Sequence, residues 1–191
     1  MALDVPEGRA LLASAATADL DGLRASFQSQ EKSSWCGVAS SVVVLDARAD
    51  HLTQDTFFTP EATAVRSWWR VTLTGMPLDD LAGMLRAHGA DVEVHHADDV
   101  DEAAFRAALR TNLATPGDWL VANYDRSALG ESGGGHLSPL GAFAESEDMV
   151  LILDVSAYKY PPHWVPVTAL FGAMSTVDSE SGRARGWVSV R

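Results

Sequence analysis

Cysteine is almost absent from this sequence, because Cys36 is the only one among 191 residues. An internal disulfide therefore cannot form, and zinc sites built from several cysteines are excluded as well. A chain of this length is expected to bury a core that is stable without such cross-links. We predict a single domain over residues 1–191 that contains no metal site.

Basic side chains and long apolar runs are also scarce. The chain has 14 Lys and Arg against 26 Asp and Glu, giving a formal net charge of -12, and the acidic residues are spread along it. This charge opposes a phosphate backbone, so we expect no nucleic-acid partner. No segment approaches the roughly 18 apolar residues of a membrane span, and the N-terminus lacks the basic start of a secretion signal. We expect a soluble, cytoplasmic protein with no membrane partner, or an exported or periplasmic one if a signal has been removed.

The first two thirds of the chain have the spacing of helices. Short helices are predicted within residues 1–27, and the segment that begins at Cys36 is apolar for more than two helical turns. Its three consecutive valines would suit a strand equally well by propensity, but the chemistry of Cys36 favours a helix. Further helices are predicted from Pro60, from Pro77 and over residues 101–113.

The last third changes to strand patterns. Apolar runs of strand length are DWLVANY, HLSPLGAFAE and DMVLILDVSAY, separated by a glycine-rich loop and a polar turn. Helices followed by antiparallel strands indicate an α+β fold, with an N-terminal helical part and a C-terminal antiparallel sheet.

Cys36 is the first candidate for chemistry. A lone cysteine is usually a small buried hydrophobic residue. Here it is followed by small residues and preceded by a polar loop that contains Gln30. The N-terminal end of a helix would also stabilise a thiolate relative to the free thiol, whose pKa is about 8.5. These features favour a nucleophile.

His136 is the best partner for such a thiolate among the six histidines. It follows three glycines, the last of which is Gly135, and it begins a predicted strand. The backbone there is accessible to a ligand, so Gly135 is a candidate substrate-binding residue. A ring held by a sheet is suited to take and return a proton near neutral pH.

Asp154 ends the apolar run VLILD, where a carboxylate is costly unless it has a partner. If residues 136–144 and 149–156 form a hairpin, His136 and Asp154 lie at the same end of neighbouring strands. Asp154 would then orient the imidazole. The alternative is an aspartate that is merely exposed at a strand end.

The order Cys, His, Asp, with the cysteine opening a helix, is the arrangement of papain-like thiol enzymes. Such an enzyme also needs two donors for the oxyanion that forms on the substrate. The backbone N–H of Cys36 and the side chain of Gln30, six residues earlier, are the candidates.

Three segments carry a family resemblance: SQEKSSWCGVASSVVVLDA, GGGHLSPLGAFAESEDMVLILDVSAYKYPPHWVP and FGAMSTVDSESGRARGW. They resemble the phytochelatin synthases, a papain-like family, from about Glu7 nearly to the C-terminus. The resemblance implies Cys36 as nucleophile, His136 as acid and base, Asp154 as its orienting group and Gln30 as oxyanion donor. It also implies that Arg185 binds a γ-glutamyl group.

The resemblance further implies an activity. Family members form a γ-glutamylcysteinyl thioester from glutathione, release glycine, and pass the acyl group to water or to a second thiol peptide. This chain lacks the Cys-rich C-terminal region of plant members, so we expect mainly hydrolysis and weak peptide elongation. We expect no tightly bound cofactor, a heavy-metal ion only as a thiolate complex with substrate, and a homodimer.

Departures from the family leave other functions open. Ala157 stands where the family commonly has Arg, which puts any contact made there in doubt. Tyr158 and Tyr160 follow closely and are candidate pocket residues. The alternatives are a non-catalytic module that binds thiol peptides or metal thiolates, and a cysteine peptidase or amidase of other specificity.

Overall fold

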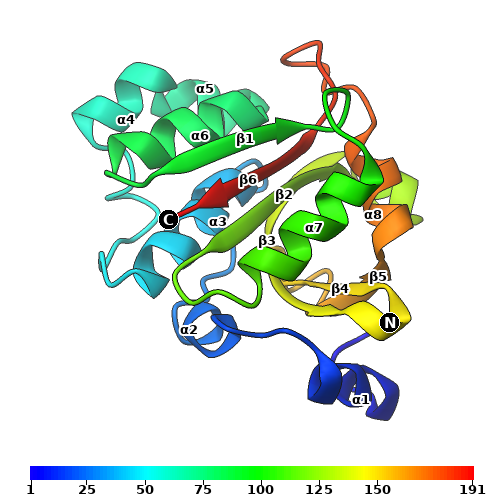
Figure 1. Cartoon of the computed structure of the whole chain (residues 1–191). Coiled ribbons are helices and arrows are strands. Elements are labelled where there is room, and N and C mark those ends of the chain that lie inside the picture. The colour runs from blue at the N-terminus through cyan, green and yellow to red at the C-terminus, as the bar shows by residue number, and fades with distance from the viewer.

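The computed structural model describes residues 1–191 and is built around one antiparallel sheet of six strands in the order β1-β6-β2-β3-β4-β5. Helices cover both faces of this sheet, and Figure 1 shows α7 and α8 on one side and α3 on the other. The strands are β1 (Val92–His96), β2 (Trp119–Asp125), β3 (Gly135–Ala144), β4 (Met149–Ile152), β5 (His163–Pro166) and β6 (Gly186–Val190). The helices are α1 (Pro6–Ser14), α2 (Leu20–Ala25), α3 (Cys36–Ala47), α4 (Pro60–Val65), α5 (Trp68–Thr74), α6 (Leu78–Ala87), α7 (Glu102–Asn112) and α8 (Val167–Met174), with short 3₁₀ turns η1 (Arg126–Leu129) and η2 (Glu145–Glu147).

The core has two parts, one on each face of the sheet. The larger cluster of 32 buried residues joins the sheet to α3 and α6, and the second, of 18, joins it to α7 and α8. Along β2, Val121 belongs to the first cluster, whereas Leu120 and Ala122 belong to the second. Successive side chains of a strand point to opposite faces, so a fully apolar strand is needed where both faces are covered.

Helix α3 passes through the larger part of the core. Every residue from Cys36 to Leu45 is buried, which explains why this segment shows no polar face in the sequence. The Ser40 hydroxyl donates to the Leu137 carbonyl oxygen at 2.9 Å and so links the helix directly to β3. The first turn of α3 is therefore held at a fixed height against the strand that carries His136.

The predicted α+β, papain-like architecture is confirmed, including the helix that begins at Cys36; the alternative of a strand there is wrong. The helix predicted from Pro60 is two helices, because Arg66 adopts an extended conformation between α4 and α5. Three strands and one helix, namely β1, β5, β6 and α8, were not predicted. The division of the chain into domains stays a prediction.

The predicted hairpin around the polar turn exists as β3 and β4, with η2 between them. Its second strand is shorter than expected, since β4 ends at Ile152, and the register shifts between Leu140 and Ala142. Asp154 therefore lies just beyond the strand rather than in it. Beyond β4 the chain continues antiparallel to β3, where the Leu153 N–H donates to the Pro139 carbonyl oxygen at 2.9 Å.

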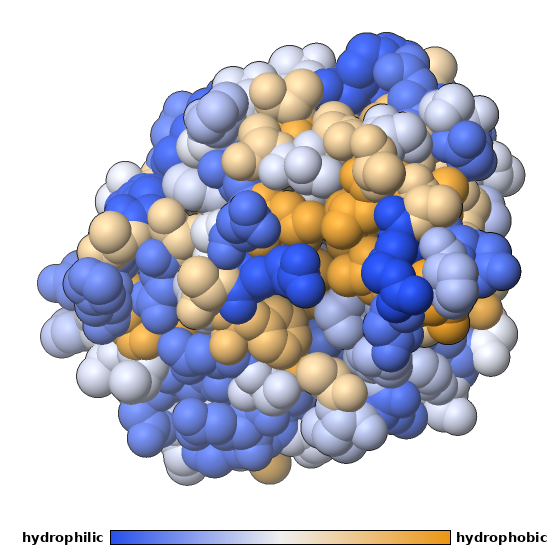
Figure 2. All heavy atoms as spheres, turned by 90° about the horizontal axis from the view of Figure 1, so that it is seen from below, coloured by the Kyte–Doolittle hydropathy of each residue, from blue (hydrophilic) through white to orange (hydrophobic).

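The face seen in Figure 2 has hydrophobic atoms in its middle beside strongly hydrophilic side chains. Helices α1 and α2 lie on this side of the molecule in Figure 1. A pocket of about 420 Å³ is lined by Leu3, Asp4, Arg9, Leu12, Arg24, Pro161 and Pro162. None of these side chains is a nucleophile or a base suited to neutral pH.

No helix of the fold has the length and apolar character needed to cross a membrane.

Stability should depend on α3 far more than on the surface of α5. Leu45 is fully buried, whereas Leu73 is 72% exposed. Leu45→Ala should lower the free energy of unfolding by about 2–5 kcal/mol, because it removes apolar contacts and leaves a cavity. Leu73→Ala, the matched control, should change it by no more than about 0.5 kcal/mol. Urea unfolding followed by circular dichroism measures both, and equal effects would contradict the assignment of α3 to the core.

Candidate active site

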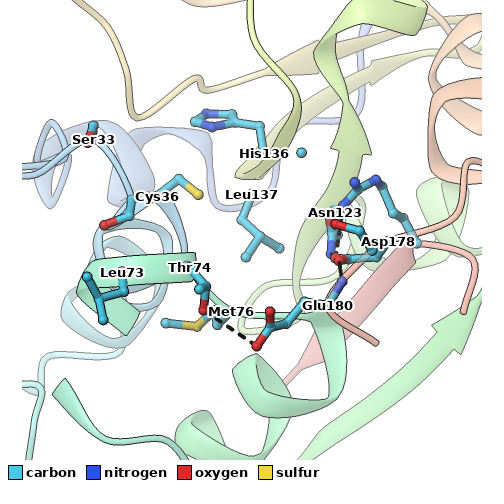
Figure 3. Close-up of a pocket in the computed structure, with 15 residues that line it drawn as sticks. Ser33, Cys36, Leu73, Thr74, Met76, Asn123, His136, Leu137, Asp178 and Glu180 are labelled. Carbon is cyan, nitrogen blue, oxygen red and sulfur yellow. Dashed lines mark hydrogen bonds and ion pairs between the residues drawn. The ribbon is translucent and has the colours of Figure 1, made fainter. Parts of the chain in front are cut away.

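Cys36, His136 and Asp154 come together although they lie on three separate elements. Cys36 is the first residue of α3, His136 is the second residue of β3, and Asp154 follows β4. Figure 3 shows the Cys36 thiol on the side of the pocket where the His136 ring lies. The imidazole lies near enough to the thiol for each group to shift the pKa of the other. The sequence-based expectation that these three residues converge agrees with their positions in the fold.

Asp154 holds the other side of the imidazole. His136 Nε2 lies 2.9 Å from Asp154 Oδ1, so the ring donates from Nε2 and turns Nδ1 toward the thiol. Asp154 is fully buried, and the same oxygen accepts from the Ser156 backbone N–H at 2.7 Å. A buried carboxylate is tolerated only when such donors compensate for its lost hydration. Asp154 is therefore not an exposed strand end, and its contact with the imidazole is the one expected of an orienting group.

Arg126 contacts both Asp154 and His136 and was not predicted from the sequence. Its guanidinium Nη2 donates to Asp154 Oδ1 at 2.6 Å and lies 3.0 Å from His136 Nε2. Arg126 begins η1, directly after β2, and is only 6% exposed. The sequence around an arginine that follows an apolar strand does not indicate which carboxylate it will bind. Arg126 gives Asp154 a cation in a chain that has Ala157 where the family commonly has Arg.

The charges of the three residues shift one another's pKa values. Burial raises the pKa of the Cys36 thiol, but the adjacent His136 and backbone N–H groups outweigh burial and lower it overall. Burial lowers the pKa of His136, but the thiolate and Asp154 raise it overall. For Asp154, burial is likewise outweighed, here by His136 and Arg126, and the pKa falls to about 2. The arrangement therefore favours a thiolate–imidazolium pair next to an ionised carboxylate.

The thiol opens into a pocket of about 450 Å³. Most of its walls are polar, and Figure 3 shows Cys36 and His136 on one side with Asn123 and Asp178 on another. The lining residues are Ser33, Ser34, Cys36, Leu73, Thr74, Gly75, Met76, Asn123, Gly135, His136, Leu137, Asp178, Ser179, Glu180 and Arg185. A polar recess beside a thiolate suits a small hydrophilic substrate.

Arg185 lines this pocket, and its binding of a γ-glutamyl group stays a prediction. Its Nη1 donates to Asp178 Oδ2 at 2.9 Å and to Asn123 Oδ1 at 3.2 Å. Asn123 and Asp178 were not predicted, because they lie 55 residues apart in the sequence and only the sheet brings them together. The guanidinium covers Gly135, where an added Cβ would lie 2.6 Å from Arg185 Nη1. Gly135 thus leaves room for Arg185.

Gln30 does not line the pocket. Its side-chain amide donates to the carbonyl oxygens of Lys32 at 2.9 Å and Ser33 at 3.0 Å, and its backbone N–H donates to Val155. These bonds brace the loop before Cys36 against the segment that carries Asp154. Its role as an oxyanion donor stays a prediction.

Tyr158 and Tyr160 are not among the pocket-lining residues either. Tyr158 is 76% exposed. The Tyr160 hydroxyl accepts from the Ser132 N–H at 2.7 Å, and its ring lies 5.2 Å from the Arg126 guanidinium carbon. Tyr160 therefore touches the site through Arg126, and a substrate contact by either tyrosine stays a prediction.

No group of three or more His, Cys, Asp or Glu side chains is placed to hold a metal ion.

An α+β fold in which a cysteine at the start of a core helix meets a histidine and an aspartate from a neighbouring sheet defines the papain-like class. Comparison with known proteins narrows this class. The family model for phytochelatin synthase matches residues 1–187, and the chain belongs to the phytochelatin synthase family.

Relatives of known name agree with this membership. Glutathione gamma-glutamylcysteinyltransferase 3 of Lotus japonicus is 32% identical over 182 residues, covering 86% of this chain and 36% of that protein. Glutathione gamma-glutamylcysteinyltransferase 1 of Triticum aestivum is 34% identical, covering 86% of this chain and 34% of that protein. Glutathione gamma-glutamylcysteinyltransferase 2 of Arabidopsis thaliana is 32% identical, covering 88% and 39%. The chain thus spans little more than a third of the length of these relatives.

Alkylation of Cys36 should report the ion pair. The lowered thiol pKa predicts that iodoacetamide reacts quickly at pH values below the usual thiol range, and that its rate falls only when the pH drops below this lowered pKa. In His136→Ala, burial is no longer opposed by the imidazole, so the rate should reach half its plateau at a higher pH. His95→Ala, on the distant strand β1, is the control and should leave the profile unchanged. Identical profiles for His136→Ala and the wild type would refute the pair.

Proposed function

We propose that this protein is a cysteine-dependent enzyme that cleaves the Cys–Gly amide of glutathione. Cys36 facing His136 beside a polar pocket is the observation that carries the proposal. The names of its relatives, which are glutathione gamma-glutamylcysteinyltransferases, support glutathione as the substrate. The donors and acceptors within the pocket support it independently.

Recognition of the γ-glutamyl end follows from the charges in the pocket. This end carries an α-carboxylate and an α-ammonium on one carbon. Arg185 offers a planar guanidinium to a carboxylate, and Asp178 beside it offers a carboxylate to an ammonium. The two side chains are already paired with each other, so a zwitterion replaces contacts of the same kind and pays little for desolvation.

The reaction begins with attack of the Cys36 thiolate on the carbonyl carbon of the Cys–Gly amide. The carbonyl oxygen becomes an oxyanion, for which the Cys36 N–H at the start of α3 is the first proposed donor. The Gln30 amide is the second, and it must give up a carbonyl oxygen of Lys32 or Ser33 to donate. His136 gives its proton to the glycine nitrogen as the C–N bond breaks. Glycine leaves, and a γ-glutamylcysteinyl thioester remains on Cys36.

The second half of the reaction regenerates the thiolate. Neutral His136 takes a proton from water, or from the amine of a second thiol peptide, as that nucleophile attacks the thioester. Water gives γ-glutamylcysteine, whereas the peptide gives a longer chain. We propose that hydrolysis dominates. We also propose that any heavy-metal ion enters as a thiolate complex with the substrate, since Cys36 is the only thiol of the chain.

Glycine release is the direct test of this reaction. The protein incubated with glutathione should yield free glycine and γ-glutamylcysteine, and mass spectrometry should detect the acyl adduct on Cys36. Cys36→Ala should reduce glycine release to background, because no other thiol can form the adduct. Glycine release that survives this substitution would refute the mechanism. Reversible binding without an adduct would instead support a non-catalytic binding module. If the elongated thiol peptide formed in greater amount than γ-glutamylcysteine, the preference for hydrolysis would be wrong.

Gly135→Ala should weaken substrate binding without unfolding the chain. The new methyl group would displace the Arg185 guanidinium, which is the far end of a flexible side chain. We expect the KM for glutathione to rise about tenfold or more, the loss produced by removing a hydrogen bond to a charged group, with a smaller change in kcat. Gly134→Ala is the matched control, since nothing lies within 4 Å of its added Cβ. Equal KM values for the two variants would exclude a role for Arg185 in binding.

A further inference from the structure

The pocket wall opposite the triad is a tight hairpin at residues 177–184. Val177 and Ala184 form an isolated antiparallel bridge, and within it the Asp178 N–H donates to the Arg183 carbonyl oxygen at 2.8 Å. Gly182 permits the reversal because its φ is +72°. This hairpin directs Asp178 and Glu180 into the pocket.

Glu180 is tied to the opposite wall through a buried arginine. Arg66, at the end of α4, is 3% exposed, and its Nη2 donates to Glu180 Oε1 at 2.7 Å. The Thr74 hydroxyl lies 3.5 Å from the same oxygen, and Figure 3 draws this contact across the pocket edge. Arg66 also pairs with Asp80 on α6 at 2.6 Å. The Arg66 guanidinium is thereby anchored to the helices through Asp80 and binds the hairpin through Glu180.

This contact also fixes the residue proposed to bind the ammonium group. The Glu180 backbone N–H donates to Asp178 Oδ1 at 2.9 Å, while the other oxygen of Asp178 accepts from Arg185. Movement of Glu180 would therefore disturb Asp178 as well. Opening this edge would leave Arg66 buried with one of its two carboxylates lost, which is costly for a charge removed from water.

We propose that the Arg66–Glu180 pair is a latch that closes the pocket beyond Asp178 and restricts the acyl donor to one whose γ-glutamyl amine carries no further group. This inference rests on the proposed function. An added acyl group on that amine removes the ammonium charge and must occupy the space where the hairpin meets α5. Glu180 is thus a specificity-determining residue and Arg66 a positioning residue that acts through it.

The test compares glutathione with N-acetylglutathione by glycine release. In the wild type, kcat/KM for the acetylated peptide should be far below that for glutathione. Glu180→Ala should raise the ratio of kcat/KM for N-acetylglutathione to kcat/KM for glutathione about tenfold, mainly through a lower KM for N-acetylglutathione. Glu180→Gln keeps an oxygen that accepts from Arg66 and should shift the ratio much less. A general loss of folding would lower both kcat/KM values and leave their ratio unchanged.

Arg183→Met is the matched control, because Arg183 lies on the same hairpin but points outward to Asp98 and Asp99. It should leave the ratio at the wild-type value. A ratio that is unchanged in a Glu180→Ala variant that circular dichroism shows to be folded, with an active wild type, refutes the latch and leaves the proposed function intact. A wild type without Cys36-dependent glycine release refutes both.

Discussion

The burial of one carboxylate organises this site. Asp154 has no solvent exposure, and its charge is balanced by Arg126, by His136 and by a backbone N–H. Because an unpaired buried charge is so costly, these donors are fixed in position along with it. The imidazole is held with one nitrogen toward the carboxylate and the other toward Cys36. The pKa of the Cys36 thiol is then lowered by a histidine whose own pKa is raised by the thiolate and by Asp154. The same segment anchors the loop before the nucleophile, since the carbonyl oxygen of Val155 accepts from the Gln30 N–H.

Close packing of α3 against the sheet is the second requirement. Gly37 follows the nucleophile, and a Cβ at this position would lie 2.7 Å from Met76 and 2.9 Å from Leu137. The absence of that atom lets the first turn of the helix approach β3 closely enough for the thiol to reach the imidazole. The hydrogen bond from Ser40 to the Leu137 carbonyl oxygen fixes the height of the helix along the strand. Thiol and imidazole are thus carried by two rigid elements rather than by loops, which is how precise catalytic geometry is usually maintained.

The pocket differs from the chain as a whole in its distribution of charge. The formal net charge is -12, yet the pocket brings together Arg185 and Asp178, and places Glu180 on Arg66 at its edge. Paired charges of this kind suit a zwitterion better than a simple anion. They also couple recognition to pocket shape, because the carboxylate that would meet the ammonium group lies on the hairpin that the buried arginine holds closed. Selection of the acyl donor and positioning of its scissile amide beside Cys36 would then depend on one connected set of contacts.

The sequence by itself determined the α+β class, the helix that begins at Cys36, and the candidates His136 and Asp154, because these follow from local periodicity and from the chemistry that a lone thiol needs. The family resemblance added Arg185. The tertiary structure decided what depends on contacts between distant segments: the end of β4 at Ile152, which leaves Asp154 beyond the strand, the cation supplied by Arg126, and the pocket residues contributed by other strands and the hairpin. Strands β1, β5 and β6 were not predicted, because short strands are defined by their pairing partners more than by their own residues.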